Sequence, residues 1–293
     1  MILKLQQAIV FKTGLCKLTL TDGVYVKSHI IPVALTRLPT NGKKIVQSGI
    51  GLGVKSRFVS WYDDKLVTRA GENILEKIDT SAINILRNNQ LIWSSWGSDK
   101  SSLSSDFVDE FGELTFRMIR FTQAKELQLF FLSVVWRSAV TQRPEFSEVH
   151  LSNEIVEDLR SRVVSQDSGT LSDYPVQLFQ IVTKGTLHNR TPVLESKIVE
   201  FEPDDRREIN YVRVYFDGLV AHVHLPLLKN FDERFLRTCL QSEADTLVFT
   251  NKFDDSRAAA NIKEMVATVL KERTVPPSKL TLISSAIRNT LKN

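Results

Sequence analysis

The spacing of apolar residues predicts a helix near the end of the first third of the chain. Within residues 71–89, Ile74, Ile78, Ala82 and Ile85 recur at intervals of four and three. This spacing places them on one face of an α-helix, because such a helix has 3.6 residues per turn. We therefore expect this helix to pack one apolar face against a core.

Three further segments have patterns that are typical of helices. Residues 122–141 are apolar around most of the helical circumference, which predicts a helix in the middle of a core. Residues 152–164 predict an amphipathic helix whose N-cap is either Ser152 or Asn153. The apolar stripe within residues 254–273 predicts a helix near the C-terminus.

Strands are expected in the second half of the chain. Residues 174–184, 192–203 and 209–227 are rich in Val, Ile, Phe and Tyr, the residue types that favour β-structure. The third segment contains Asp217 and Gly218 at its centre, a pair that predicts a hairpin turn.

The N-terminal region also predicts a hairpin. Residues 17–31 alternate between apolar and polar positions around Asp22-Gly23, which is the signature of a type I′ turn. Shorter strands are expected at 45–47 and 57–61.

Composition is that of an ordinary globular protein. The chain has 293 residues, of which 42% are hydrophobic and 25% charged. It contains no apolar run long enough to span a bilayer and no recognisable secretion signal, so we expect no membrane association. Its two cysteines are far apart, which argues against a disulfide framework and favours the cytoplasm.

Charge is distributed unevenly. Residues 1–60 contain nine Lys and Arg residues and one acid, Asp22, which gives this region a charge of +8. Because the whole chain carries +4, the remainder carries −4. A basic region of this kind is either a solvated surface or a binding surface for a polyanion such as nucleic acid.

Two segments carry the most specific motif. Residues 14–35 read GLCKLTLTDGVYVKSHIIPVAL, and residues 66–79 read LVTRAGENILEKID. They resemble the HNH-endonuclease-like (His-Me finger, ββα-metal) class, in which a C-x-x-C pair precedes an SHIIP strand and a second pair opens a helix. Together with residues 126–140 and 146–160, the resemblance covers roughly residues 14–160.

The zinc-binding cysteines of that class are mostly absent. The resemblance aligns the first pair with Cys16 and Thr19, and the second with Thr68 and Gly71. A structural zinc site needs four Cys or His ligands, so no structural zinc is expected at Cys16. The simpler interpretation of Cys16 is a small buried hydrophobic residue.

The resemblance assigns catalytic chemistry to His29. In that class the equivalent histidine is the general base that takes a proton from the water attacking phosphorus, and Mg²⁺ or Mn²⁺ stabilises the developing charge. Asn73 is the second catalytic candidate, and Glu72 and Glu76 are the candidate ligands of a divalent ion. The alternative is that His29 donates a hydrogen bond to the backbone and does no chemistry.

One weaker motif lies in the second half of the chain. His222 and His224 lie two residues apart and therefore on one face of a strand. They form either a partial metal site or, more simply, a pair of structural polar residues.

The predicted fold class is α+β. An N-terminal ββα-finger-like module, residues 1–96, is followed by a larger α+β domain, residues 107–293, which contains a central buried helix and an antiparallel sheet. The Ser- and Gly-rich residues 93–106 are the expected linker.

The resemblance, together with the basic region, implies two alternative functions. The first is a nucleic-acid-binding protein derived from an HNH-type nuclease, acting on DNA in antiviral defence or a mobile element; if it is an enzyme, it is a metal-dependent phosphodiesterase. The second is a catalytically inactive scaffold that binds a protein partner in a complex. The residues expected to contact phosphates are Lys27, Arg37, Lys43, Lys44, Lys55 and Arg57.

Overall fold

The computed structural model confirms the α+β class. It describes residues 12–36, 60–186, 188–202, 205–227 and 231–263, together with the backbone of 45–48 and 55–57. A seven-stranded sheet has the order β11-β12-β13-β9-β14-β8-β7. Its strands are β7 (Asp109–Phe111), β8 (Leu114–Ile119), β9 (Val176–Ile181), β11 (Val193–Glu202), β12 (Asp205–Phe216), β13 (Leu219–His224) and β14 (Thr246–Asn251).

The sheet is mixed, whereas an antiparallel sheet was predicted. β14 pairs parallel with β9, and the other neighbouring strands are antiparallel. The predicted hairpin turn at Asp217-Gly218 is confirmed, because it joins the antiparallel strands β12 and β13. The hairpin β7–β8 and the interior strand β14 were not predicted.

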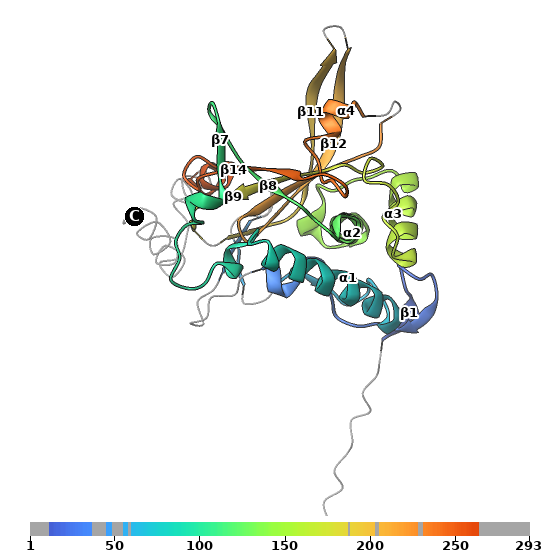
Figure 1. The fold of residues 1–293 in the computed structure, drawn as a ribbon. Helices are drawn as coiled ribbons and strands as arrows, with labels where there is room; N and C mark the ends of the chain where they lie inside the picture. The colour runs from blue at the N-terminus through green and yellow to red at the C-terminus, as the bar shows by residue number, and fades with distance from the viewer. Residues whose placement is uncertain are drawn as a thin grey trace, which may run out of the picture.

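The three longest helices of the described residues lie on one side of this sheet (Figure 1). They are α1 (Arg69–Asn88), α2 (Ala124–Val140) and α3 (Asn153–Ser165), and all three were predicted. Most side chains of α2 are fully buried, as expected for a helix that is apolar on nearly all sides. Ser152 caps α3 by accepting a hydrogen bond from the backbone N–H of Ile155 at 3.4 Å.

Short elements complete the described part of the fold. Three small sheets are formed by β1 (Thr13–Leu15) with β2 (Asp22–Val24), by β3 (Ser28–His29) with β6 (Tyr62–Asp63), and by β4 (Ile45–Ser48) with β5 (Lys55–Arg57) and β10 (His188–Arg190). The short helices are α4 (Glu233–Leu236), η1 (Val33–Leu35), η2 (Trp93–Ser95), η3 (Ser105–Phe107) and η4 (Pro144–Phe146). Residues 257–263 are also helical, and the rest of the predicted C-terminal helix lies outside the described residues.

The predicted turn of the first hairpin is wrong. Asp22 and Gly23 lie within strand β2, and Asp22 is paired with Leu15. The chain instead reverses over residues 17–19, where the backbone N–H of Leu20 donates to the carbonyl of Cys16 at 3.0 Å. Leu20 adopts a left-handed conformation with φ of 55°, which supplies the reversal that was assigned to Asp22-Gly23.

One hydrophobic core contains residues from both predicted domains. It includes Cys16, Leu18 and Ile30 from the N-terminal region, and Phe130 and Val248 from the later part of the chain. The division into residues 1–96 and 107–293 stays a prediction, as does the finger-like module, because β3 and β6 are each only two residues long.

The segment predicted as a linker is packed against the fold. Trp93, Trp96 and Leu103 are buried in a second apolar cluster. The indole N–H of Trp93 donates to the carbonyl of Ile181 at 2.8 Å, which ties the segment to β9. Serine and glycine content suggested flexibility, but the two tryptophans supply enough apolar surface to anchor the segment.

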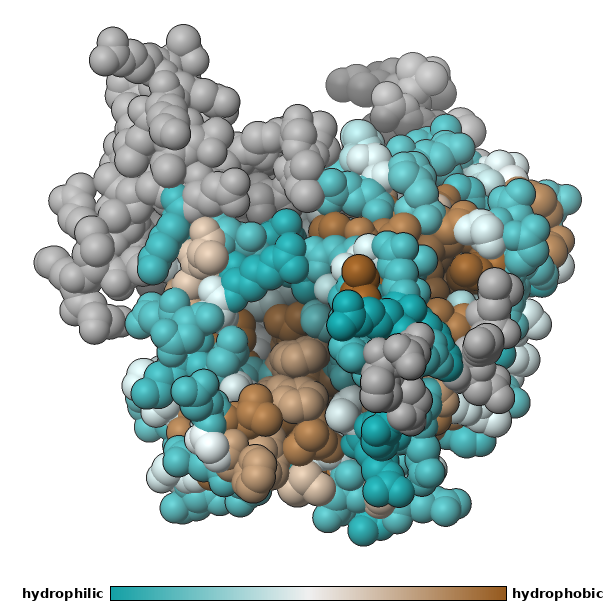
Figure 2. All heavy atoms as spheres, turned by 90° about the horizontal axis from the view of Figure 1, so that it is seen from above, coloured by the Kyte–Doolittle hydropathy of each residue, from teal (hydrophilic) through white to brown (hydrophobic). Residues whose placement is uncertain are grey.

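The opposite side of the sheet is only partly covered. α4 packs over one part of it and residues 257–263 over another. Figure 2, which views this side, shows a hollow with apolar side chains at its base and polar side chains around it.

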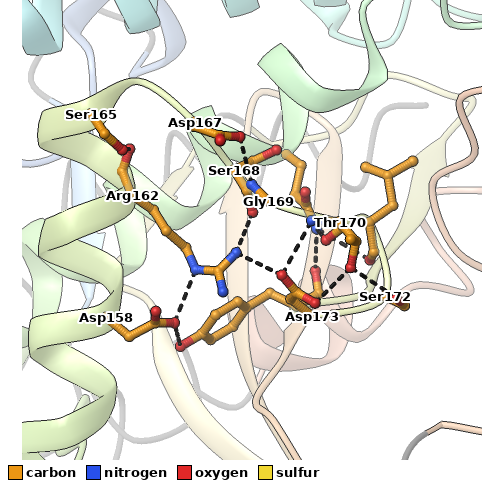
Figure 3. A network of polar contacts seen from close by, with 12 residues as sticks. Asp158, Arg162, Ser165, Asp167, Ser168, Gly169, Thr170, Ser172 and Asp173 are labelled. Atoms are coloured by element: carbon orange, nitrogen blue, oxygen red, sulfur yellow. Dashed lines mark hydrogen bonds and ion pairs between the residues drawn. The ribbon is translucent and has the colours of Figure 1, made fainter.

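A polar network fixes the loop that follows α3 (Figure 3). Arg162 donates to Asp158 at 2.9 Å and to Asp173 at 2.8 Å. The Tyr174 hydroxyl donates to Asp158 at 2.7 Å. These contacts hold the chain as it turns from α3 towards β9 and thus support the edge of the core.

Candidate functional site

His29 lies on β3 and faces a tyrosine on the neighbouring strand. β3 pairs antiparallel with β6, so that His29 is opposite Tyr62. The two rings meet edge to face, with centroids 6.3 Å apart. The ammonium group of Lys27 lies 3.9 Å from the centroid of the Tyr62 ring, which is a cation–π contact. One predicted phosphate-binding residue therefore lies beside the predicted base.

A buried arginine connects this strand to two helices. Arg137 on α2 donates to the backbone carbonyl of His29 at 3.0 Å. Its guanidinium group also forms a bidentate ion pair with Asp79 on α1, with distances of 2.7 and 2.9 Å. Two hydrogen bonds to Ser133 complete its set of partners. Arg137 thus fixes the position of β3 relative to α1 and α2.

The surroundings of His29 favour its neutral form. Burial lowers the pKa of His29 below its ordinary value of 6.5, and the positive charges of Lys27 and Arg137 lower this pKa further. The negative charge of Asp79 opposes these effects without reversing them. A neutral imidazole at pH 7 is able to accept a proton, as a general base must.

A second polar group lies between β3 and α1. Ser28 is completely buried, and its hydroxyl oxygen has no hydrogen-bond partner among the described residues. The same is true of Oε2 of Glu72. Burial raises the pKa of Glu72, and the nearby Ser28 hydroxyl opposes that shift. Glu72 is therefore the predicted ligand residue with an unpartnered buried oxygen.

The remaining predicted catalytic and metal-binding residues are not gathered around His29. Asn73 and Glu76 are exposed on α1. Ser28 and His29 are consecutive on a strand, so their side chains point to opposite faces, and Ser28 is the one that lies near Glu72. In the part of the chain that the structure describes, no three His, Cys, Asp or Glu side chains form a group that could hold a metal ion. Glu72 and Glu76 stay predictions as ligands.

The four positions aligned with zinc ligands come together in space. The backbone N–H of Thr19 points to Sγ of Cys16 at 3.4 Å, and a Cβ built on Gly71 would lie only 2.8 Å from the same sulfur. Burial raises the pKa of Cys16, but polar contacts with Thr19 and Thr68 outweigh that effect and lower it overall. Cys16 is fully buried and belongs to the main core.

Most of the predicted phosphate-binding residues cannot be located. Arg37, Lys43 and Lys44 lie outside the described residues. Lys55 and Arg57 lie on β5, of which only the backbone is described. Their role in binding phosphates stays a prediction.

Sequence reasoning did not identify the most connected residue of the site. Arg137 is separated from His29 by 108 positions, yet it is the residue that anchors the His29 backbone. The available signal was its presence in a helix whose other side chains are mostly apolar, since a buried charge needs partners.

Comparisons with known proteins leave the resemblance as a prediction. Among the described residues no helix is long and apolar enough to cross a membrane. No family model matches the chain, and neither a curated protein nor a solved structure matches it.

Proposed function

We propose that this chain is a nucleic-acid-binding protein derived from an HNH-type nuclease, located in the cytoplasm, and that His29 is its general base. The observation that carries the proposal is the position of His29 on β3, which pairs with β6 and is joined to α1 through Arg137. The basic region of residues 1–60 supplies the charge for binding DNA.

The chemistry that the described residues support is limited to one proton transfer. Neutral His29 accepts a proton from the water molecule that attacks a phosphodiester. Lys27, two positions before it in the sequence, places a positive charge near the phosphate. Glu72 is the residue best suited to bind Mg²⁺ or Mn²⁺, but the described residues do not supply a complete ligand set.

A nicking assay tests the catalytic part of the proposal. Supercoiled plasmid is incubated with Mg²⁺ or Mn²⁺ and with wild-type protein, His29→Ala or the control His150→Ala, which changes an exposed histidine. We expect nicking by the wild type and the control and a loss of at least about 100-fold in His29→Ala, since a general base contributes about that much. Equal nicking activity in all three proteins, or no activity in the wild type, refutes the proposal that His29 is the general base of a nuclease.

A binding assay tests the nucleic-acid part separately. The affinity for a short DNA duplex should fall steeply with salt, because each neutralised phosphate releases counterions. Replacing Lys43 and Lys44 by Ala should reduce the slope of log affinity against log salt by about two. Absence of binding at low salt would contradict the proposal.

An inactive scaffold is the second candidate, and one observation favours it. Cys16 is packed against Thr19, Thr68 and Gly71, so a metal ion is not needed to hold this corner together. Under this alternative the wild-type protein neither nicks nor binds DNA, but it forms a stable complex with a protein partner.

Rebuilding the zinc ligands tests the resemblance itself. The variant Thr19→Cys/Thr68→Cys/Gly71→Cys places four thiols where the four positions converge, and the Cys16 sulfur must shift to admit the new side chain, since a Cβ at residue 71 would lie 2.8 Å from it. We expect it to bind Co²⁺ with the visible absorption of a tetrahedral thiolate site, and Zn²⁺ to raise its melting temperature while leaving the wild type unchanged. A variant that folds but gives no cobalt spectrum would show that these positions do not have zinc-site geometry.

A further inference from the structure

The open side of the large sheet carries a continuous apolar surface. Phe249 on β14 is paired with Phe116 on β8 and with Phe179 on β9, so three phenylalanines lie side by side on neighbouring strands. The rings of Phe179 and Phe249 are stacked with centroids 5.3 Å apart. Val220 on β13 continues the row beside Phe179. These side chains are only partly buried, and Figure 2 shows the hollow in which this apolar surface is exposed.

Arginines gather at one end of this surface around a single carboxylate. Arg213 and Arg257 both form ion pairs of 2.9 Å with Glu195. The Tyr211 hydroxyl donates to the same carboxylate at 3.0 Å. One negative charge therefore neutralises only one of the two guanidinium groups.

A third arginine in the same place is unsatisfied. Arg190 on β10 is close enough to Arg213 and Arg257 for their charges to oppose its own, yet it has no ion pair or hydrogen bond of its side chain within the described residues. Burial lowers the pKa of Arg190, and the charges of Arg213 and Arg257 add to that effect, whereas the carboxylates of Glu195 and Glu148 oppose it without reversing it. Three guanidinium groups therefore share two carboxylates, Glu195 and Glu148, and the positive charge that is left over marks a place for a further anion.

Neighbouring polar atoms are also unpartnered. Oε2 of Glu148 and Nδ1 of His222 are buried without a hydrogen-bond partner among the described residues. Burial raises the pKa of Glu148, and the nearby charges of Arg190 and Arg213 oppose that shift. Arg213 is directly opposite His222 on β13, which places Arg213 two residues, or about 7 Å, from the Val220 row.

The geometry points to a binding site for a small amphipathic anion. Its carboxylate or phosphate group would bind Arg190 and Arg257, and its hydrocarbon body would lie on Phe179 and Phe249. The spacing of about two strand residues between these parts suits a body of several carbon atoms. The site combines residues of the large sheet with Arg190 on β10 and Arg257 in the helical residues 257–263, and it is independent of the function proposed for His29.

Calorimetric titration with matched ligands tests this site. Octanoate and octyl phosphate carry both parts, octanol carries only the hydrocarbon chain, and acetate carries only the charge. We expect one of the two octyl anions to bind at least about tenfold more tightly than octanol or acetate, because charged hydrogen bonds and apolar burial both contribute. The tighter of the two identifies the headgroup as carboxylate or phosphate.

Two variants and one control decide the assignment. Arg190→Gln should weaken binding of the preferred anion by about tenfold or more, and Arg206→Gln should leave it unchanged; Arg206 is an exposed arginine that pairs with Glu200 on the β11–β12 hairpin. Phe179→Ala should also weaken the binding of both octyl anions. Circular dichroism checks that each variant is folded. Absence of octyl anion binding to the wild type overturns the proposal, as does unchanged binding in both Arg190→Gln and Phe179→Ala.

Discussion

Replacing Arg137 by methionine should destabilise the whole fold. The guanidinium group is 1% exposed and makes five hydrogen bonds of 2.7 to 3.2 Å, to Asp79, His29 and Ser133. Methionine fills a similar volume but leaves the Asp79 carboxylate, 17% exposed, without its partner. Removing one member of a buried pair costs about 3–5 kcal/mol, and the partial exposure of Asp79 places the expected loss near the lower end, at about 3 kcal/mol.

Urea unfolding followed by circular dichroism measures this loss. With a denaturant slope of roughly 3 kcal/mol/M, a loss of about 3 kcal/mol lowers the unfolding midpoint by about 1 M. The double variant Arg137→Met/Asp79→Leu should recover a large part of the loss, because no buried charge is then left unpaired. The control Arg237→Met breaks an exposed pair with Glu233 and should leave the midpoint unchanged. A shift below about 0.3 M for Arg137→Met would refute the reasoning, since the buried pair would then be worth no more than a surface pair.

Three further predictions concern other buried groups. Burial raises the pKa of Glu72 in the folded protein, so this residue should lower the stability of the wild type as pH rises above about 4.5. Urea unfolding midpoints measured from pH 4 to 8 should show this fall in the wild type and not in Glu72→Gln. Burial lowers the pKa of folded His224 to about 2, so stability should decline as pH falls below about 6.5, and His224→Phe should reduce this decline. Gly218→Ala should lower the free energy of unfolding by at least about 2 kcal/mol, because the φ of Gly218 is +85° and a Cβ there would lie 2.3 Å from Nε1 of Trp93. The control Gly112→Ala should cost less, because Gly112 has a φ of +61° and a Cβ there would have no atom within 4 Å. Equal shifts of the melting temperature in the two variants would contradict this prediction.

The helices were predictable because their signals are local. The apolar stripe of α1, the all-round apolar pattern of α2 and the Ser152 cap of α3 each lie within one segment of the sequence. The strands β8 and β14 carry only six residues each, and they were missed. These segments form strands because they pair with each other: Arg117 on β8 is opposite Val248 on β14, more than a hundred positions away in the sequence. A local sequence pattern does not identify such a distant partner.

The candidate site was predictable only as far as its residues are close in sequence. Ser28 and His29 were found by their motif, but the partners that set their environment come from α1 and α2. The spacing of Glu72 and Glu76 suggested two ligands on one helical face, and the packing of α1 buries only the first carboxylate. Burial against distant elements decides which of several similar side chains has an unusual pKa, and the sequence does not contain that information.

The corner around Cys16 shows how a predicted set of positions can meet without the chemistry that first suggested it. Thr19 lies beside the sulfur because the chain reverses over residues 17–19, and Gly71 lies beside it because α1 begins there. The absence of a side chain at Gly71 leaves room for the Cys16 sulfur, since a Cβ would come within 2.8 Å of it. Close packing of a buried sulfur against a glycine therefore holds the first hairpin against α1, and a metal ion bound there would require that packing to open.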